Sequence, residues 1–471
     1  MLSDKGLNAS FYTSLVIGLA GVLIGVAVGY GAGAVPVYIG LLFGVIAVLI
    51  FFFARFELAV LTLLVLRSSL DPFSAQQVPA AFAIGLDALT ILYIIVQILL
   101  RQKINTDKFF WFFAGWVAFL GIWLVLPVLG WGSLGKSYLI DGIREWTRIF
   151  SWLMVYLLVM QLKGKIHPQK AISALFFSTI VPLIVGLLQL FTPSLLPSVL
   201  LDRPNYLNST IGHPSAFGSF LFLFICLTLW KLGHARNRWG WLILLGLAAF
   251  LMVMSRSLTS LIMFTVFIIA LIAPKLNFLR LIGGILFIVL VFYLFVSTEF
   301  GHEKLNAVLE TPVFNQELDI SRTILLSFGD GNSANWRIAQ WAFLIDAWKE
   351  SPFLGYGLGT SQYITYFENY AHNDYLRFLA ETGIIGFTSF MVFLGVKMLR
   401  LIKYLQSSAI SSPRRKLSSI MIAIFMAILV GMTTDNVWSH TTLFFYWCLL
   451  FAVLGWESKY WENGEKSRVR S

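Results

Sequence analysis

Charged side chains are scarce in this sequence. Only 12% of its 471 residues are charged, whereas 58% are hydrophobic, and the mean hydropathy is +0.81. Soluble domains carry about 25% charged residues, because a surface in water needs polar cover. The scarcity of charged residues argues against a soluble globular fold and indicates a protein embedded in the lipid membrane.

Cysteine and paired outer carboxylates are also scarce. The two cysteines, Cys226 and Cys448, both fall in apolar runs, which excludes a disulfide framework and a cysteine-rich metal site. Divalent cations in membrane sugar transferases need grouped carboxylates. The only closely spaced outer pair is Glu317 with Asp319, in a stretch without other signals. We therefore expect no metal and no other cofactor.

Long apolar runs are what the sequence does contain. A run of about 17–25 apolar residues reads as a membrane-spanning helix. The fold class predicted is an all-α polytopic membrane protein with about fourteen spans, twelve or thirteen being the alternatives. We expect the first to remain uncleaved, since it is longer than the core of a signal peptide. The expected spans are 11–31, 35–53, 57–66, 83–100, 109–130, 148–162, 171–191, 214–230, 241–254, 258–273, 281–297, 384–399, 418–434 and 441–456.

Basic residues give these spans an orientation. With the N-terminus in the cytoplasm, every expected inner connection carries Lys or Arg, and most of the 34 basic residues lie inside. Both termini are then cytoplasmic, as expected for a bacterial inner membrane protein. This bias accounts for the net charge of +11, so no nucleic-acid partner is predicted.

One extracytoplasmic loop, residues 298–383, differs from the rest of the chain. It holds nearly half of the acidic residues and many aromatic ones, too many for a disordered segment. We expect short helices in it. One is predicted over 335–350 with Asn335 as its N-cap, and a second begins near His372 and leads into the next span.

Two arginines, Arg256 and Arg337, are candidates for anion binding. Arg256 lies in the short stretch Met254-Ser-Arg-Ser-Leu-Thr-Ser260 between two apolar runs. A charge at that depth is costly and is usually functional, the alternative being an arginine that reaches to lipid headgroups. Arg337 is flanked by aromatics, and an ordinary solvated loop arginine is its alternative.

A histidine could supply the proton acceptor. An imidazole can take a proton from a hydroxyl, so His372 is a candidate base, with Asn373 and Asp374 as possible orienting groups, although a lone loop histidine is often inert. The glycines of Gly355-Tyr-Gly-Leu-Gly359 could expose N–H groups to an anion, or simply form turns.

The remaining polar residues of the outer connections are also candidates, and the alternative for each is an ordinary residue at the membrane interface. They are Asp202, Arg203, His213, Asp435 and His440.

Three stretches in order resemble the O-antigen ligase and O-antigen polymerase family of bacterial envelope glycosyltransferases. The first is the stretch around Arg256. The second is Trp336-Arg-Ile-Ala-Gln-Trp341, followed by Ser351-Pro-Phe-Leu-Gly-Tyr-Gly-Leu-Gly-Thr360. The third is Ala371-His-Asn-Asp-Tyr-Leu376, followed by Glu381-Thr-Gly-Ile-Ile-Gly386. The resemblance covers about 210–400; elsewhere only the number and hydrophobicity of the spans agree.

The resemblance implies metal-independent transfer or polymerisation of a glycan from an undecaprenyl-pyrophosphate-linked donor to a glycan or lipid acceptor, in surface polysaccharide biosynthesis (O-antigen, lipopolysaccharide or exopolysaccharide). His372 then looks like the general base, and Arg256 with Arg337 looks like the pair that binds the pyrophosphate. Guanidinium groups suit that task because they carry permanent charge in a bidentate geometry. The secondary candidates are Arg203, His213, Tyr356, Asn373 and Tyr375.

On this reading the chain divides into N-terminal membrane helices (1–209), the family-like region (210–400), and C-terminal helices with a cytoplasmic tail (401–471). The main alternative function is a membrane transporter of a small anion or of a lipid-linked sugar. Transporters usually show repeated halves and charges near the midplane, which are sparse here. Between polymerase and ligase, the number of spans favours the polymerase only by analogy.

Overall fold

A computed structural model describes residues 36–130, 138–201, 206–233, 235, 237–273, 278–309, 311, 333–365, 367–406, 412–457 and 460–461. Within these ranges the chain is helical and contains no β-strand. The α-helices are α2 (Pro36–Ala54), α3 (Phe56–Leu66), α4 (Val78–Leu99), α5 (Lys108–Leu120), α6 (Ile122–Val125), α7 (Leu139–Met160), α8 (Pro168–Leu175), α9 (Ile180–Phe191), α10 (Pro214–Leu232), α11 (Trp239–Met254), α12 (Leu258–Ile272), α13 (Phe278–Val296), α14 (Glu299–Leu309), α16 (Ser333–Glu350), α17 (Ser361–Ile364), α18 (Asp374–Gln406), α19 (Ser412–Gly431) and α20 (Thr441–Leu454). Short 3₁₀ turns join several of them, including η1 (Arg67–Ser69), η2 (Asp71–Phe73), η4 (Phe176–Thr179) and η8 (Val437–Ser439).

Helices occupy every expected span except 11–31, which lies outside the described residues. Among the described residues, five helical stretches are long and apolar enough to cross a membrane: Val78–Leu99, Lys108–Val125, Pro168–Phe191, Pro214–Leu232 and Asp374–Gln406. Their outer surfaces are apolar, with Leu99 72% and Phe191 68% exposed. Such side chains favour hydrocarbon over water. The prediction of an all-α polytopic membrane protein is therefore confirmed, while the number of fourteen spans stays a prediction.

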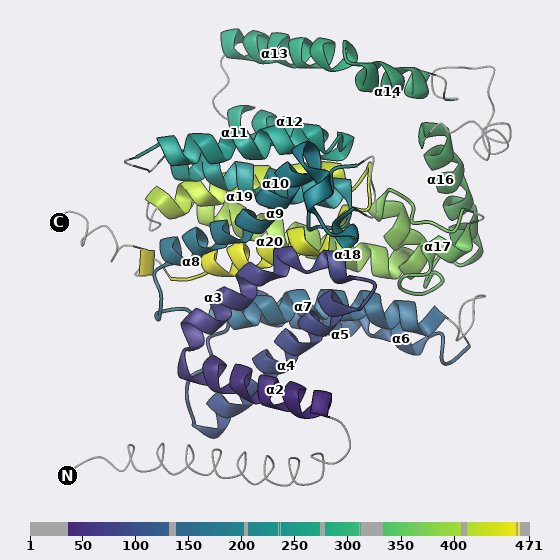
Figure 1. Cartoon of the computed structure of the whole chain (residues 1–471). Coiled ribbons are helices and arrows are strands. Elements are labelled where there is room, and N and C mark those ends of the chain that lie inside the picture. Colours follow the sequence, from purple (N-terminus) through teal and green to yellow (C-terminus); the bar gives the residue numbers. More distant parts are fainter. Residues whose placement is uncertain are drawn as a thin grey trace, which may run out of the picture.

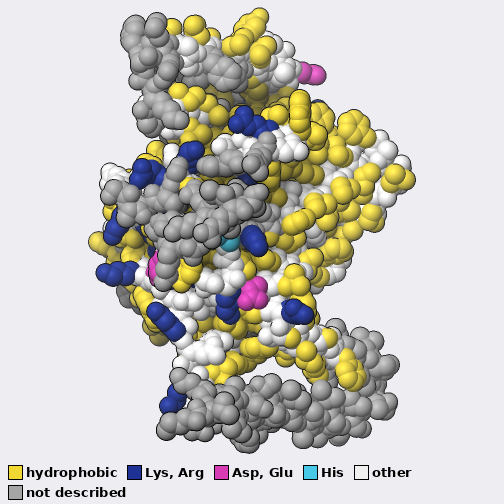
Figure 2. Space-filling view, turned by 90° about the vertical axis from the view of Figure 1, so that its left-hand side faces the viewer, with side chains coloured by type: hydrophobic (Ala, Val, Ile, Leu, Met, Phe, Trp, Pro, Cys, Tyr) yellow, Lys and Arg dark blue, Asp and Glu magenta, His cyan; other side chains and the backbone are white. Residues whose placement is uncertain are grey.

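The bundle has two distinct ends (Figure 1). Helix α8 lies toward the left-hand end in that view, and α16 and α17 lie at the right-hand end. Figure 2 views the left-hand end, where Lys and Arg side chains are scattered among hydrophobic ones and outnumber the visible acidic ones. An excess of basic residues is typical of the cytoplasmic side, and the orientation expected from the sequence stays a prediction.

The segment 298–383, which the sequence predicts to lie outside the cytoplasm, carries α14, α16 and α17 among its described residues. Helix α16 confirms the expected helix over 335–350, but it begins at Ser333. The prediction that Asn335 caps it was wrong, because Asn335 lies within the first turn. The second expected helix begins at Asp374, two residues after His372, and continues as α18 with a kink at Gly383 (φ 61°).

A tryptophan anchors the turn between α19 and α20 in the core. Trp438 on η8 is fully buried, and its ring centroid lies 5.0 Å from Trp152 and from Phe390. Its backbone N–H donates to Asp374 Oδ2 at 2.7 Å. Stacked and edge-on aromatic contacts of this kind fix ring positions. The turn 432–440 is thereby held firmly against the start of α18.

Candidate active site

His372 lies on a constrained loop at the mouth of α18. Its φ of 49° is in the left-handed region, and its backbone N–H donates to Asn436 Oδ1 at 2.9 Å. Its imidazole Nδ1 lies 2.9 Å from Asp435 Oδ1, and the side chain stays 21% exposed. Because an ionised carboxylate only accepts, Nδ1 carries the proton in a neutral ring and Nε2 keeps its lone pair. The ring is therefore arranged to accept a proton at Nε2.

Asp435 is the orienting group that sequence reasoning missed. The sequence placed it only at an outer turn; its pairing with a histidine 63 residues earlier arises from the fold. Burial opposes its ionisation, but the hydrogen bond with His372 and the nearby His440 outweigh burial and hold the pKa of Asp435 well below its usual range. The Thr259 hydroxyl donates to Oδ2 at 3.1 Å. Asp435 is thus a fixed negative charge behind the imidazole.

The residues expected to orient His372 have other partners. Asn373 Oδ1 accepts the backbone N–H groups of Tyr375 and Leu376, both at 3.1 Å, and so caps α18. Asp374 accepts the N–H of Trp438. The prediction that these two neighbours orient the ring was wrong, because they turn into the helix start while Asp435 reaches the imidazole from the next loop.

Arg337 lies beside this pair on α16. The ring of Trp336, its neighbour, contacts the His372 ring edge to face at 5.4 Å between centroids. Burial lowers the pKa of Arg337, and the charge of Asp435 opposes that change, which places the two charges within electrostatic range. Guanidinium stays protonated in proteins. Its Nε is buried without a hydrogen-bond partner, and no ion pair of Arg337 occurs among the described residues.

Arg256 occupies the turn between α11 and α12, with a left-handed φ of 51° and an exposed side chain. The residues after it join the turn to the site. Ser257 caps α12 by accepting the N–H of Ser260, and Thr259 reaches Asp435. Across the described part of the chain, Arg256 forms no ion pair. The turn therefore presents a free guanidinium from the element that contacts Asp435.

Two more histidines lie on the α10 side. His213 caps α10, its Nδ1 accepting the N–H of Ser215 at 3.2 Å. His440 Nδ1 lies 3.0 Å from the Ser219 hydroxyl, and burial lowers the pKa of His440 to about 4 although the charge of Asp435 opposes the shift. His440 is consequently neutral at neutral pH. Arg203, the other secondary candidate of this region, lies outside the described residues.

The two candidate tyrosines brace helices. The Tyr375 hydroxyl donates to the carbonyl of Leu429 at 2.8 Å. Tyr356 is 8% exposed, and its hydroxyl lies 3.1 Å from both the Ala347 carbonyl and Glu350 Oε2. Neither hydroxyl is hydrogen-bonded to His372 or Asp435. Their part in the reaction stays a prediction.

The glycine segment 355–359 does bind a carboxylate, but that carboxylate belongs to the chain itself. Glu381 on α18 accepts the N–H of Gly359 at 2.9 Å and the hydroxyl of Ser361 at 2.6 Å. The N–H groups that were expected to bind an anion therefore bind a carboxylate of the chain itself. The backbones also touch: a Cβ on Gly355 would lie 2.5 Å from the Ala380 carbonyl oxygen. Glycine is needed there because the two main chains are in contact.

A buried ion network supports this layer. Arg377 is paired with Glu381 and with Glu145 of α7, both at 3.0 Å, and donates to Ser439 at 2.8 Å. Arg148, one turn along α7, also pairs with Glu145 at 3.0 Å and keeps 22% of its side chain exposed. Sequence reasoning missed this network because its members lie far apart along the chain. It joins the glycine segment to the turn that carries Asp435.

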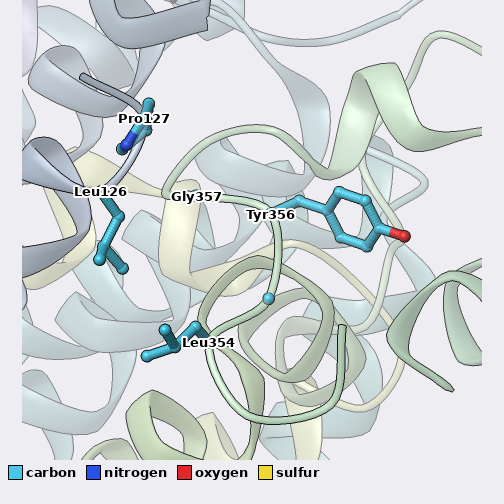
Figure 3. Close-up of a pocket in the computed structure, with 6 residues that line it drawn as sticks. Leu126, Pro127, Leu354, Tyr356 and Gly357 are labelled. Carbon is cyan, nitrogen blue, oxygen red and sulfur yellow. The ribbon is translucent and has the colours of Figure 1, made fainter. Parts of the chain in front are cut away.

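The hollow in Figure 3 is small and lined mainly by apolar and backbone groups. Its lining includes the secondary candidate Tyr356 but not His372, Asp435, Arg337 or Arg256. The lining residues are Leu126, Pro127, Leu354, Gly355, Tyr356 and Gly357. It marks where the glycine segment packs against the end of α6.

No group of three or more His, Cys, Asp or Glu side chains is arranged to hold a metal ion within the described ranges. The outer pair Glu317 and Asp319 lies outside them. The expectation that the site works without a metal therefore stays a prediction. The residues that the structure brings together are His372, Asp435, Arg337, His440 and the turn of Arg256.

The comparisons with known proteins bear on the same segment. No curated protein matches the chain. Residues 241–391 match the family model described as O-antigen ligase. The matched segment includes Arg256, Arg337 and His372 and ends before the turn that carries Asp435. The resemblance read from the sequence is thereby confirmed, because residues 241–391 of this chain are similar to the O-antigen ligase family.

Proposed function

We propose that this protein is an integral-membrane glycosyltransferase that moves a glycan from undecaprenyl pyrophosphate to an acceptor hydroxyl on the extracytoplasmic face, without a metal ion. The observation that carries the proposal is the His372–Asp435 pair at 2.9 Å beside Arg337, whose Nε has no hydrogen-bond partner among the described residues, in a chain whose residues 241–391 match the O-antigen ligase family. Such a transfer needs a base, an anion that stabilises the base once it is protonated, and cations that bind the leaving group.

His372 acts on the acceptor. Its Nε2 takes the proton of the acceptor hydroxyl while that oxygen attacks the anomeric carbon of the donor sugar. The imidazolium that forms is stabilised by Asp435, which is already ionised. The bond between the anomeric carbon and the pyrophosphate oxygen breaks, and the electron pair leaves with the pyrophosphate. Water then takes the proton from His372 and resets the site.

Arg337 and Arg256 act on the leaving group. Negative charge grows on the pyrophosphate oxygen as its bond to the sugar breaks, and two guanidinium groups stabilise that charge. Lys at either position keeps the charge and loses the planar fork. We expect R256K and R337K each to lose most transfer activity while inserting into the membrane normally. Full activity of R256K would instead favour a headgroup anchor.

Two members of this reaction class remain as alternatives. A polymerase joins a growing lipid-linked chain to another lipid-linked unit, and a ligase moves a finished chain to a different acceptor. The residues that we assign act on steps common to both. The site therefore supports the reaction type but does not choose the acceptor.

Glycan analysis of a strain that carries His372→Ala tests the proposal. A polymerase variant should leave single repeat units, and a ligase variant should leave long chains on undecaprenyl pyrophosphate. Asp346→Asn, on the exposed face of α16, is the matched control and should give normal glycan. Normal polymer, normally attached, in the His372→Ala strain would contradict the proposal and favour the transporter alternative.

A further inference from the structure

A partly exposed pair of tyrosines lies beside the start of α7. The rings of Tyr138 and Tyr363 lie 4.4 Å apart between centroids, and Tyr363 is 37% exposed. The Tyr363 hydroxyl donates to Asp141 Oδ2 at 3.0 Å. The other oxygen of Asp141 pairs with Arg144 at 3.3 Å, and the Arg144 side chain is 67% exposed. Two aromatic faces, a carboxylate and a guanidinium thus share one outward-facing surface.

The base of this surface is rigid. Gly359 has a left-handed φ of 75°, and a Cβ there would lie 3.0 Å from the carbonyl oxygen of Asp141. A Cβ on Gly142 would lie 3.3 Å from the carbonyl oxygen of Leu358. The start of α7 and the glycine segment are therefore in backbone contact. Because Glu381 also holds the N–H of Gly359, the tyrosine pair is positioned before any ligand arrives.

The same surface leads toward His372. Tyr363 interacts electrostatically with Tyr370, which places the two phenols near each other. The ring of Tyr370 lies over the guanidinium of Arg377 at 4.3 Å. His372 follows Tyr370 by two residues. Aromatic side chains thus mark a path from the candidate base to the exposed tyrosine pair.

We propose that Tyr138, Tyr363, Asp141 and Arg144 form a saccharide subsite that holds the glycan chain some sugar units away from the reacting bond. A pyranose has one face rich in C–H groups, which packs on an aromatic ring, and an edge of hydroxyls, which hydrogen-bond to carboxylate and guanidinium. This inference rests on the proposed function, because it names part of the substrate path of the same site.

Binding measured without catalysis tests the subsite. The full-length protein in nanodiscs is titrated with the glycan that mild acid releases from the lipid-linked intermediate of the source strain. Tyr363→Ala should weaken binding roughly tenfold, since one stacked ring is lost. Tyr363→Phe keeps the ring and should bind nearly as wild type. Tyr206→Ala, at a tyrosine that is 58% exposed on another outer segment, is the control and should leave binding unchanged.

Arg144→Ala is a second variant that keeps the test informative if Tyr363→Ala does not fold. The Arg144 side chain is mostly exposed, so its loss should leave the fold intact and weaken binding several-fold. Wild-type binding by both Tyr363→Ala and Arg144→Ala would overturn the subsite, whatever the transfer rate. Tyr363-dependent binding in a protein that transfers no glycan would contradict the proposed function and leave the subsite standing. The two failures are therefore distinguishable.

Discussion

Asp435→Asn removes one charge from behind the candidate base and changes little else in size. In wild type the buried carboxylate lies 2.9 Å from His372 Nδ1 and stabilises the imidazolium that forms during transfer. Two opposite charges about 4 Å apart interact by about 4 kcal/mol at an effective dielectric constant of about 20. His372 is partly exposed, so solvent screening reduces this to about 2–3 kcal/mol. We therefore expect the transfer rate to fall by about 30- to 150-fold.

The assay is glycan transfer by the purified protein in nanodiscs, followed across pH. Asp435→Asn should lower the maximal rate and also move the acid limb of the rate profile to lower pH, because the carboxylate no longer favours the imidazolium. A purely structural role would lower the rate without moving that limb. Asp346→Asn is the control for loss of an outer carboxylate. A rate for Asp435→Asn within threefold of wild type, with an unmoved profile, would refute the assignment.

Further outcomes are expected elsewhere in the chain. Gly355→Ala should destabilise the protein by about 2 kcal/mol or more, measured as a lower Tm, because its new Cβ would meet the carbonyl oxygen of Ala380 at 2.5 Å in a left-handed backbone. A reporter fused after Thr360 should report outside the cytoplasm and one after Ser411 inside; a cytoplasmic report at Thr360 would overturn the site assignment. Stability should fall by about 3 kcal/mol as pH drops from 6.5 to about 4, because over that range the unfolded chain binds a proton that buried His440 does not. His440→Gln should lack that part of the pH dependence, and an unchanged profile in the variant would argue against a buried neutral imidazole.

The sequence predicted the helices well because hydrophobic length is local information. Apolar runs alone placed α10, α12 and α20 within a few residues of their observed bounds. The start of α7 lies nine residues before the expected 148, at Leu139. That first part of α7 carries Glu145, whose charge is neutralised by Arg377 of α18. Such a tertiary pairing has no signature in a hydropathy pattern.

The candidate site was only partly predictable for the same reason. Chemistry-bearing residues such as His372 and Arg337 were recognisable from residue type and from the resemblance. Asp435, however, reaches His372 only because Trp438 anchors its turn in the aromatic core and Asp374 binds the N–H of that tryptophan. A contact between residues 63 positions apart depends on how α18, α19 and α20 pack. No spacing rule in one sequence reveals it.

The central claim is that His372 activates an acceptor for glycan transfer from a lipid-linked donor. It is tested most directly by supplying the purified protein in nanodiscs with the lipid-linked glycan and measuring transferred glycan together with released undecaprenyl pyrophosphate. Wild type should form both products in equal amounts, in the presence or absence of a chelator, and His372→Ala should form neither although it still binds the donor. Equal product formation by His372→Ala and wild type would contradict the account.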